Sequence, residues 1–194
     1  MMNKLIQNSI SESIAVKQAM LTDEVFAQKI ARAAQILVNS FQNGGKALFC
    51  GNGGSAADAQ HIAAELSGRF YLDRDPLYAE ALHVNSSYVT AVANDYGYDV
   101  VFARMIQAAG RSGDVLVALS TSGNSPNILK SIEMAKEKAM FVIGLTGASG
   151  GNMASLCDVL LNVPSTNTPR IQEAHILLGH IICHWVEETI FGKK

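Results

Sequence analysis

Residues 46–58 read KALFCGNGGSAAD and contain the pattern from which the fold can be inferred. A short apolar run is followed by a glycine-rich turn and then by the start of a helical stretch. The same order recurs along the rest of the chain, with turns rich in Gly, Ser or Asn. It predicts strands over 46–50, 78–84, 114–119, 140–145 and 158–163, and helices near 55–68, 87–93, 98–109, 125–138 and 168–190.

Strands that alternate with helices need crossover connections, which favour a mainly parallel sheet. We therefore expect an α/β fold of the doubly wound type. In this fold, helices cover both faces of a mainly parallel five-stranded sheet and form a three-layer αβα sandwich. The sequence contains no linker, repeat or low-complexity tract that would divide it, so we expect one domain over 1–194.

Two amphipathic helices are expected ahead of the sheet, over 3–20 and 23–43. In the first, isoleucines recur every four positions, and in the second the apolar residues follow steps of three and four. Asp23 and Glu24 are expected in the first turn of the second helix, where the helix dipole favours acidic side chains. We expect this N-terminal helical pair, residues 1–45, to pack on the sheet.

Charge is scarce in this chain. Its 194 residues include 15 Lys and Arg and 17 Asp and Glu, or 16%, whereas soluble domains usually have about 25%. The net charge of −2 provides no positive electrostatic field that would attract nucleic acid, so we expect no nucleic-acid partner. Neither a membrane span nor a signal peptide is indicated, which favours a cytoplasmic protein. Hydrophobic residues make up 48%, and apolar surface hidden between subunits would account for this composition.

The turns after the first and third strands are the candidate ligand-binding loops, because ligands bind at the carboxyl ends of parallel strands. The first turn, 51–55, has the glycines of an anion-binding loop, but also those of a purely structural tight turn. A nucleotide site is disfavoured, because the second strand ends in His83-Val84-Asn85 without an acidic residue. The other turn carries four hydroxyl residues ahead of Pro126, more than helix capping by Ser125 requires, and this favours a phosphate site.

A second candidate site involves polar residues on two helices. His61 and Glu65 stand four residues apart and share a helix face, while the C-terminal helix carries Gln172 and His180 among apolar residues. Two imidazoles, a carboxylate and an amide oxygen can hold a divalent metal such as zinc, although from spacing alone a structural role is favoured. We also expect structural roles, as reduced packed thiols and as hydrogen-bonded core or interface histidines, for Cys50, Cys157, Cys183, His83, His175 and His184.

Four blocks of the sequence resemble the sugar isomerase (SIS) domain family and, within it, the phosphoheptose isomerases. The blocks are CGNGGSAADAQH at 50–61, ND at 94–95, LSTSGNS at 119–125 and RIQE at 170–173. The resemblance covers nearly the whole chain, although residues 70–90 are not distinctive. It implies conversion of sedoheptulose 7-phosphate to glycero-manno-heptose 7-phosphate, the first step toward the ADP-heptose of lipopolysaccharide.

The resemblance also implies the roles of individual residues. Glu65 and His180 match the acid/base pair of the family, and one Zn²⁺ per subunit would be held by His61, Glu65, Gln172 and His180. The substrate would be contacted by Asn52, Gly53, Gly54, Ser55, Glu65, Asn94, Asp95, Ser120, Thr121, Ser122, Ser125 and Gln172. Members are cytosolic homotetramers with sites at subunit interfaces, so the N-terminal helices and the C-terminal helix are expected in subunit contacts.

Aldose–ketose interconversion moves a proton between C1 and C2 through an enediol, which calls for a base and an acid. We expect Glu65 to be the C–H base and His180 its acid/base partner, although zinc would compete for the lone pairs of both side chains. Two alternatives lack this chemistry: a non-catalytic SIS protein that binds the replication initiator, and a sensor of another phosphosugar. The initiator-binding relative lacks the glutamate and histidine, so their presence here favours the isomerase.

Overall fold

The computed structural model describes residues 2–192 and contains a five-stranded sheet in which every strand pair is parallel. Helices α1 (Met2–Thr22) and α2 (Glu24–Gln42) precede it. The strands are β1 (Ala47–Cys50), β2 (Ala79–Ala81), β3 (Val115–Leu119), β4 (Phe141–Thr146) and β5 (Val159–Asn162), in the spatial order β2-β1-β3-β4-β5. The remaining helices are α3 (Gly54–Ser67), α4 (Ser86–Tyr96), α5 (Val101–Ala109), α6 (Pro126–Glu137) and α7 (Thr168–Phe191). The predicted α/β fold is confirmed.

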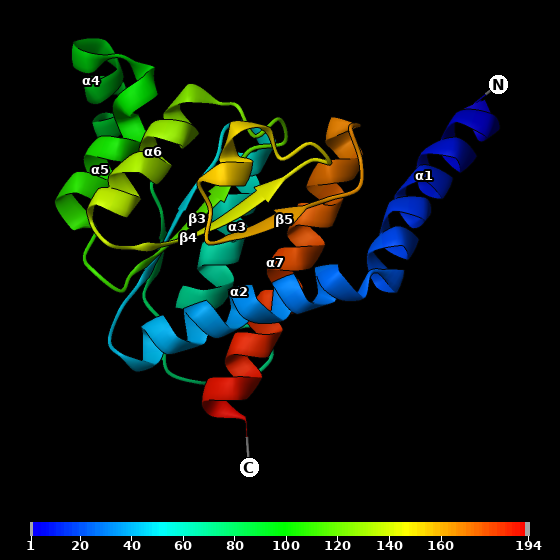
Figure 1. Cartoon of the computed structure of the whole chain (residues 1–194), viewed down its shortest axis with the longest axis horizontal. Coiled ribbons are helices and arrows are strands. Elements are labelled where there is room, and N and C mark those ends of the chain that lie inside the picture. The colour runs from blue at the N-terminus through cyan, green and yellow to red at the C-terminus, as the bar shows by residue number, and fades with distance from the viewer. Residues whose placement is uncertain (1, 193–194) are drawn as a thin grey trace.

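Both faces of the sheet are covered by helices (Figure 1). Successive side chains of a strand point to opposite faces, and β3 shows this directly. Val115 and Val117 belong to the core shared with α2, α3 and α7, whereas Leu116 and Ala118 belong to the core shared with α5 and α6. Every residue of β1 and β3 is buried, which explains why their sequences read as continuous apolar runs.

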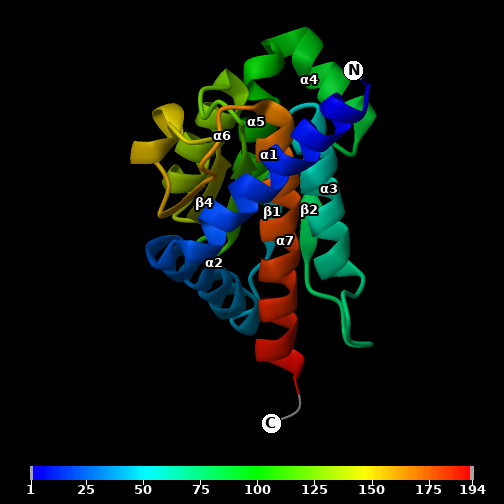
Figure 2. The ribbon, with the colours of Figure 1, turned by 90° about the vertical axis from the view of Figure 1, so that its right-hand side faces the viewer.

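Helix α1 projects from the body of the molecule and crosses the start of α7 (Figures 1 and 2). Arg170 of α7 anchors it by donating a hydrogen bond to the Ser9 carbonyl, at 2.6 Å. The isoleucines that recur along α1 are not covered, since Ile6, Ile10 and Ile14 are 52%, 56% and 60% exposed. A long helix therefore presents an apolar stripe to the surroundings of the chain.

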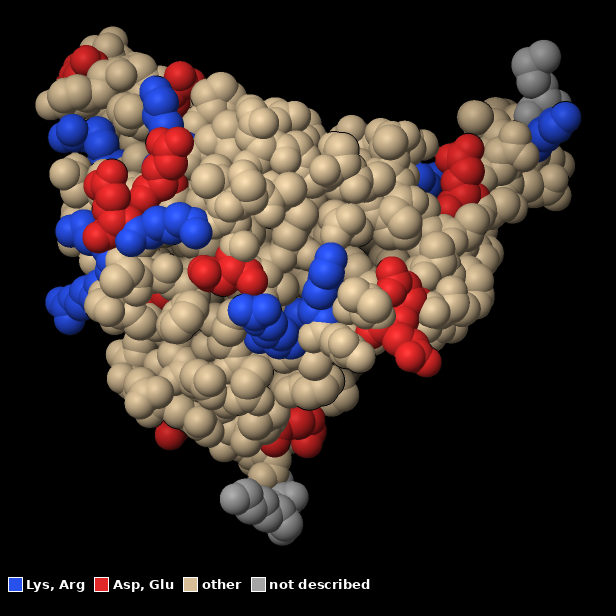
Figure 3. Space-filling view, viewed as in Figure 1, with Lys and Arg blue, Asp and Glu red and all other residues tan. Residues whose placement is uncertain are grey.

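Charged side chains gather in small groups, and a wide uncharged area lies between them on the face seen in Figure 3. Within residues 2–192, no helix combines the length and the apolar composition needed to cross a membrane.

Three local predictions were wrong in detail. The second strand has only three residues, because the chain turns directly after Ala81, whose carbonyl accepts from the N–H of Val84 at 3.4 Å. The helix predicted over 98–109 begins with a 3-10 turn before α5, after Gly97 at φ +90° has changed the chain direction. Asp23 is not in the first turn of α2 but caps it, and its carboxylate accepts from the N–H of Phe26 at 2.9 Å.

The cysteines and His175 have the structural roles predicted for them. All three cysteines are free thiols, with Cys50 and Cys183 buried and Cys157 half-buried. Burial raises the pKa of Cys50 to about 12, which keeps its thiol protonated. His175 is fully buried and hydrogen-bonded to the Thr146 carbonyl, and burial lowers its pKa to about 4, so the imidazole is neutral.

A buried ion pair fixes the segment that follows α3 against α7. The side chains of Glu187 and Arg74 are 1% and 3% exposed, and Arg74 Nε lies 3.0 Å from Glu187 Oε1. Glu187 also accepts from the N–H groups of Phe70, Tyr71 and Leu72. Burial opposes ionisation, but these N–H groups and Arg74 lower the pKa of Glu187 below its ordinary value.

We expect Glu187→Ala to lower the free energy of unfolding by about 3–5 kcal/mol, because it leaves the Arg74 guanidinium buried without its partner. Urea unfolding at a fixed subunit concentration measures the change. Glu188→Ala is the matched control: this neighbouring side chain is 55% exposed, so the expected change is within about 0.5 kcal/mol. Equal losses in the two variants would contradict a special role of the buried pair.

Candidate active site

The glycine-rich turn connects β1 to α3 at the carboxyl edge of the sheet. Gly53 has φ +54° and precedes the first residue of α3, a conformation that glycine adopts at low cost. A Cβ on Gly54 would lie 2.5 Å from Nε2 of Gln172, so the α7 side chain closes over this turn. The hydroxyl-bearing Ser55 is 4% exposed in the first turn of the helix. The turn therefore offers backbone N–H groups at a helix N-terminus.

The hydroxyl loop follows β3 and brings three serine side chains together. Ser120 Oγ lies 3.0 Å from Ser125 Oγ and 3.4 Å from Ser122 Oγ. Ser125 is the N-cap residue of α6, yet its side chain makes no capping hydrogen bond. The loop also borders a cavity of about 320 Å³ that Thr121 helps to line. Grouped hydroxyls ahead of a twelve-residue helix suit a phosphate group better than a capping role alone.

Two further candidate residues for substrate contact lie near the end of α4. Asn94 and Asp95 are exposed near the end of α4, and the Asn94 amide donates to the Asp95 carboxylate at 2.9 Å. Tyr98, three residues further on, donates its hydroxyl hydrogen to Asn52 Oδ1 at 3.2 Å. This hydrogen bond joins the segment that follows α4 to the glycine-rich turn that contains Asn52.

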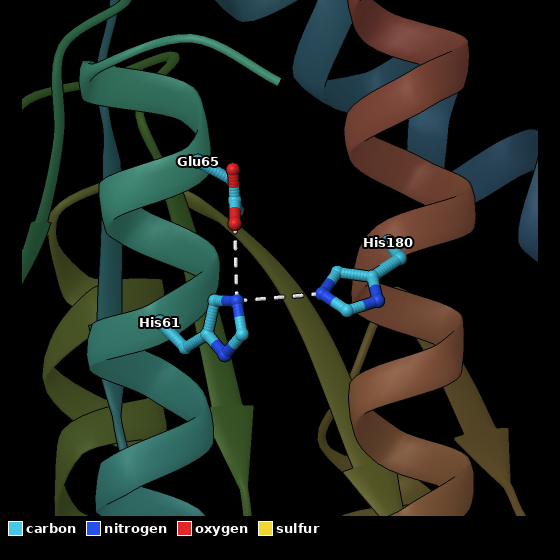
Figure 4. A group of neighbouring side chains, drawn as sticks. All are labelled: His61, Glu65 and His180. Atoms are coloured by element: carbon cyan, nitrogen blue, oxygen red, sulfur yellow. Dashed lines mark hydrogen bonds and ion pairs between the residues drawn. The ribbon is translucent and has the colours of Figure 1, made fainter. Parts of the chain in front are cut away.

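His61 and Glu65 of α3 meet His180 of α7 where the two helices lie side by side (Figure 4). His61 Nε2 is 3.0 Å from Glu65 Oε1 and 3.4 Å from His180 Nε2. One ligand atom from each residue lies within 4.8 Å of the other two. Imidazole nitrogens and carboxylate oxygens are the donors that zinc uses in catalytic sites, so this group fits a divalent metal.

Aromatic and acidic side chains surround this group. The ring of Phe70 lies 5.6 Å from that of His180, centroid to centroid. Asp58 stands one turn before His61 on α3, and within residues 2–192 its buried Oδ2 has no hydrogen-bond partner. Burial raises the pKa of Asp58, and the nearby His61 opposes this shift. The proximity of Phe70 to the site depends on its contact with α7 and has no signal in the sequence. Asp58 precedes His61 by one helical turn of α3, so its place beside the site follows from helical spacing once α3 is assigned.

Gln172 lies away from the group formed by His61, Glu65 and His180. Its amide lies against Gly54, and eight residues separate it from His180, which is about 12 Å along the axis of α7. In the same way, Ser55 and Glu65 are ten residues apart, which is about 15 Å along the axis of α3. One chain therefore carries two polar centres. The first, which we call the cradle, consists of the hydroxyls and N–H groups of the two loops at the carboxyl edge of the sheet, and the second is the metal-compatible group further along α3 and α7.

The sequence matches known proteins over its whole length. A family model described as the SIS domain matches residues 11–147. The chain is 54% identical over 193 residues to a phosphoheptose isomerase of Aneurinibacillus thermoaerophilus, covering 100% of this chain and 98% of that protein. It is 53% identical over 189 residues to a phosphoheptose isomerase of Burkholderia pseudomallei, covering 97% of this chain and 96% of that one.

Solved structures give the same result. A phosphoheptose isomerase from Neisseria gonorrhoeae superposes with a TM-score of 0.91 at 44% identity, covering 97% of this chain and 100% of that one. One from Francisella tularensis superposes with a TM-score of 0.93 at 38% identity, covering 97% and 99%.

We expect Ser125→Ala to weaken the binding of inorganic phosphate by about three- to tenfold, because one hydroxyl of the cradle is lost. The free energy of unfolding should change by less than about 0.5 kcal/mol, since the Ser125 side chain does not cap α6. Isothermal titration calorimetry and urea unfolding measure the two effects. A loss of about 1 kcal/mol of stability with unchanged phosphate binding would mean that Ser125 is a capping residue after all.

Proposed function

The chain belongs to the phosphoheptose isomerases of the SIS-domain family, and we propose that Glu65 and His180 carry out its isomerisation. The reaction is that of a sedoheptulose 7-phosphate isomerase, the first step of heptose synthesis. The observation that carries the residue assignment is the meeting of an acid and an imidazole from two helices in one group. We further propose that the chain acts as a single SIS domain over 1–194, with the helical pair 1–45 as part of it, in the cytoplasm.

The proposed proton transfers use one carboxylate and one imidazole. Glu65 takes a proton from C1 of the open-chain ketose, and the electrons of that C–H bond form the C1–C2 double bond of the enediol. His180 donates a proton to the C2 oxygen as its carbonyl bond is lost. Glu65 then returns its proton to C2 while the C1 hydroxyl loses its proton to His180, which leaves an aldehyde at C1. Each group ends in the protonation state in which it began.

The phosphate of the substrate is assigned to the cradle formed by the two loops. Its binding residues are Gly53, Gly54 and Ser55 of the glycine-rich turn and Ser120, Thr121, Ser122 and Ser125 of the hydroxyl loop. Hydroxyl hydrogens and the N–H groups at the starts of α3 and α6 donate to the phosphate oxygens, and the helix dipoles add favourable charge. This arrangement binds a phosphate monoester without a lysine or arginine.

We assign one zinc ion per subunit to His61, Glu65 and His180, with Gln172 as a fourth ligand. When bound, zinc supplies Lewis-acid polarisation of the sugar carbonyl. The two imidazoles have to be neutral to donate their lone pairs to the metal, and Glu65 has to be ionised. Since these ligands include both proposed acid/base groups, their roles in metal binding and in proton transfer compete.

We propose that the active form is a homotetramer with sites shared between subunits. The uncovered isoleucine stripe of α1 supports subunit contacts, because an apolar surface of this kind is usually covered in solution. The distance of about 12 Å along α7 between Gln172 and His180 supports the sharing of sites. In such a shared site, one subunit would supply His61, Glu65 and His180, and its neighbour would supply Gln172 and the cradle.

We expect Glu65→Gln and His180→Gln to lower kcat for sedoheptulose 7-phosphate by about 10²- to 10⁴-fold, because each removes a proton-transfer group. His184→Gln is the matched control, since this exposed histidine lies one turn further along α7. The assay follows heptose 7-phosphate formation with and without a chelator and added zinc. A wild-type protein that forms no heptose 7-phosphate with zinc present would exclude the isomerase, and a rate unaffected by chelation would exclude a zinc requirement.

Subunit mixing tests the shared site. Gln172→Ala and Glu65→Gln should each be nearly inactive alone, whereas mixed oligomers of the two should regain activity. The gain is expected because a shared site can combine the intact Gln172 of one subunit with the intact Glu65 of another. Activity is measured after subunit exchange, which native mass spectrometry verifies. If mixed oligomers form but remain inactive, each site lies within one chain.

A further inference from the structure

The side chains of Asn52 and Asn127 form a reciprocal amide pair between two ligand-binding loops. Asn52 Nδ2 donates to Asn127 Oδ1 at 2.9 Å, and Asn127 Nδ2 donates to Asn52 Oδ1 at 2.8 Å. Asn127 is the second residue of α6 and is only 2% exposed. A buried amide with both its donor and its acceptor engaged is held in one orientation.

Tyr98 adds a third segment to this pair. Its hydroxyl donates to the same Asn52 Oδ1, at 3.2 Å, from the turn that follows α4. A carbonyl oxygen has two lone pairs, so Asn127 and Tyr98 together use the full acceptor capacity of Asn52. The side-chain oxygen of Asn52 is therefore not free to accept a hydrogen bond from a sugar hydroxyl.

These three residues stand where the predicted substrate contacts converge. Asn52 directly precedes Gly53 in the glycine-rich turn, and Asn127 comes two residues after Ser125 of the hydroxyl loop. Tyr98 comes three residues after Asp95. We call Asn52, Asn127 and Tyr98 the amide lock, because their side chains join the three segments that carry the proposed substrate contacts.

We propose that Asn127 and Tyr98 are positioning residues that act through the Asn52 side chain to hold the glycine-rich turn and the hydroxyl loop in register around one phosphate. The inference rests on the proposed function and changes the role expected for Asn52. Its side chain belongs to the amide lock, and its backbone belongs to the phosphate-binding turn.

The nature of the cradle explains why such a lock matters. The cradle uses neutral hydroxyls and N–H groups, and hydrogen bonds weaken steeply when the donor, hydrogen and acceptor are out of line. Two loops that shift independently would lose several of these bonds together. The lock itself touches no reacting atom, so its loss should weaken binding of substrate and transition state alike and raise KM more than it lowers kcat.

The test compares Tyr98→Phe and Asn127→Leu with wild type. Tyr98→Phe removes one hydrogen bond at a half-exposed side chain, and Asn127→Leu removes both bonds of the amide pair at similar volume. Asn39→Leu is the matched control for Asn127→Leu, at an exposed asparagine of α2 that belongs to neither loop. We expect Tyr98→Phe to raise KM and the dissociation constant of inorganic phosphate about three- to tenfold, and Asn127→Leu to raise them further.

The kcat of both variants should stay within about threefold of wild type, and the control should leave KM and phosphate binding unchanged. Folded variants that bind substrate and inorganic phosphate as tightly as wild type would overturn the proposal. If Asn127→Leu does not fold, Tyr98→Phe decides alone. Phosphate titration needs no turnover, so a wild type that binds phosphate without isomerising sedoheptulose 7-phosphate would refute the proposed function and leave the lock testable.

Discussion

The contact between α3 and α7 at Gly179 is the interaction on which the metal-compatible group depends. A Cβ at this position would lie 2.5 Å from two side-chain atoms of Ile62, so any larger residue requires Ile62 to move or the helices to separate. The neighbouring residues on the two helices, His180 and His61, are thereby brought to 3.4 Å. Because protein interiors are close-packed, a larger side chain at 179 would disturb the packing of Ile62 between the helices and with it the spacing of the two imidazoles.

The same two helices are fixed a second time by the Glu187 and Arg74 pair. Arg74 donates to the carbonyl of Glu65, and Glu187 holds the N–H groups of the segment that follows α3. Packing at Gly179 sets the distance between the helices, and this network ties the end of α3 to α7. The metal-compatible group therefore depends on residues outside it, and it is built on two helices that are held at more than one point.

The parts of the site that are local in sequence could be predicted, and the parts that depend on distant pairs could not. The order of strands and helices, the two loops and the shared face of His61 and Glu65 follow from periodicity and turn residues. The pairing of His180 with them came from resemblance, because spacing alone favoured a structural role. Nothing in the sequence indicated the roles of Asn127 and Glu187, because their hydrogen-bond partners lie 75 and about 115 residues away along the chain.

The scarcity of charge in the chain gives importance to the hydrogen bonds that join its loops. A lysine or arginine attracts phosphate over several ångströms and tolerates some error in position, since the energy between charges falls only slowly with distance. Neutral hydroxyls act only at hydrogen-bond distance and in the correct direction. A cradle built from Ser120, Ser122 and Ser125 therefore needs its loops held in place. We infer that the buried amide of Asn127 provides that restraint with both of its polar groups hydrogen-bonded, which would let a cradle of neutral donors bind a dianion.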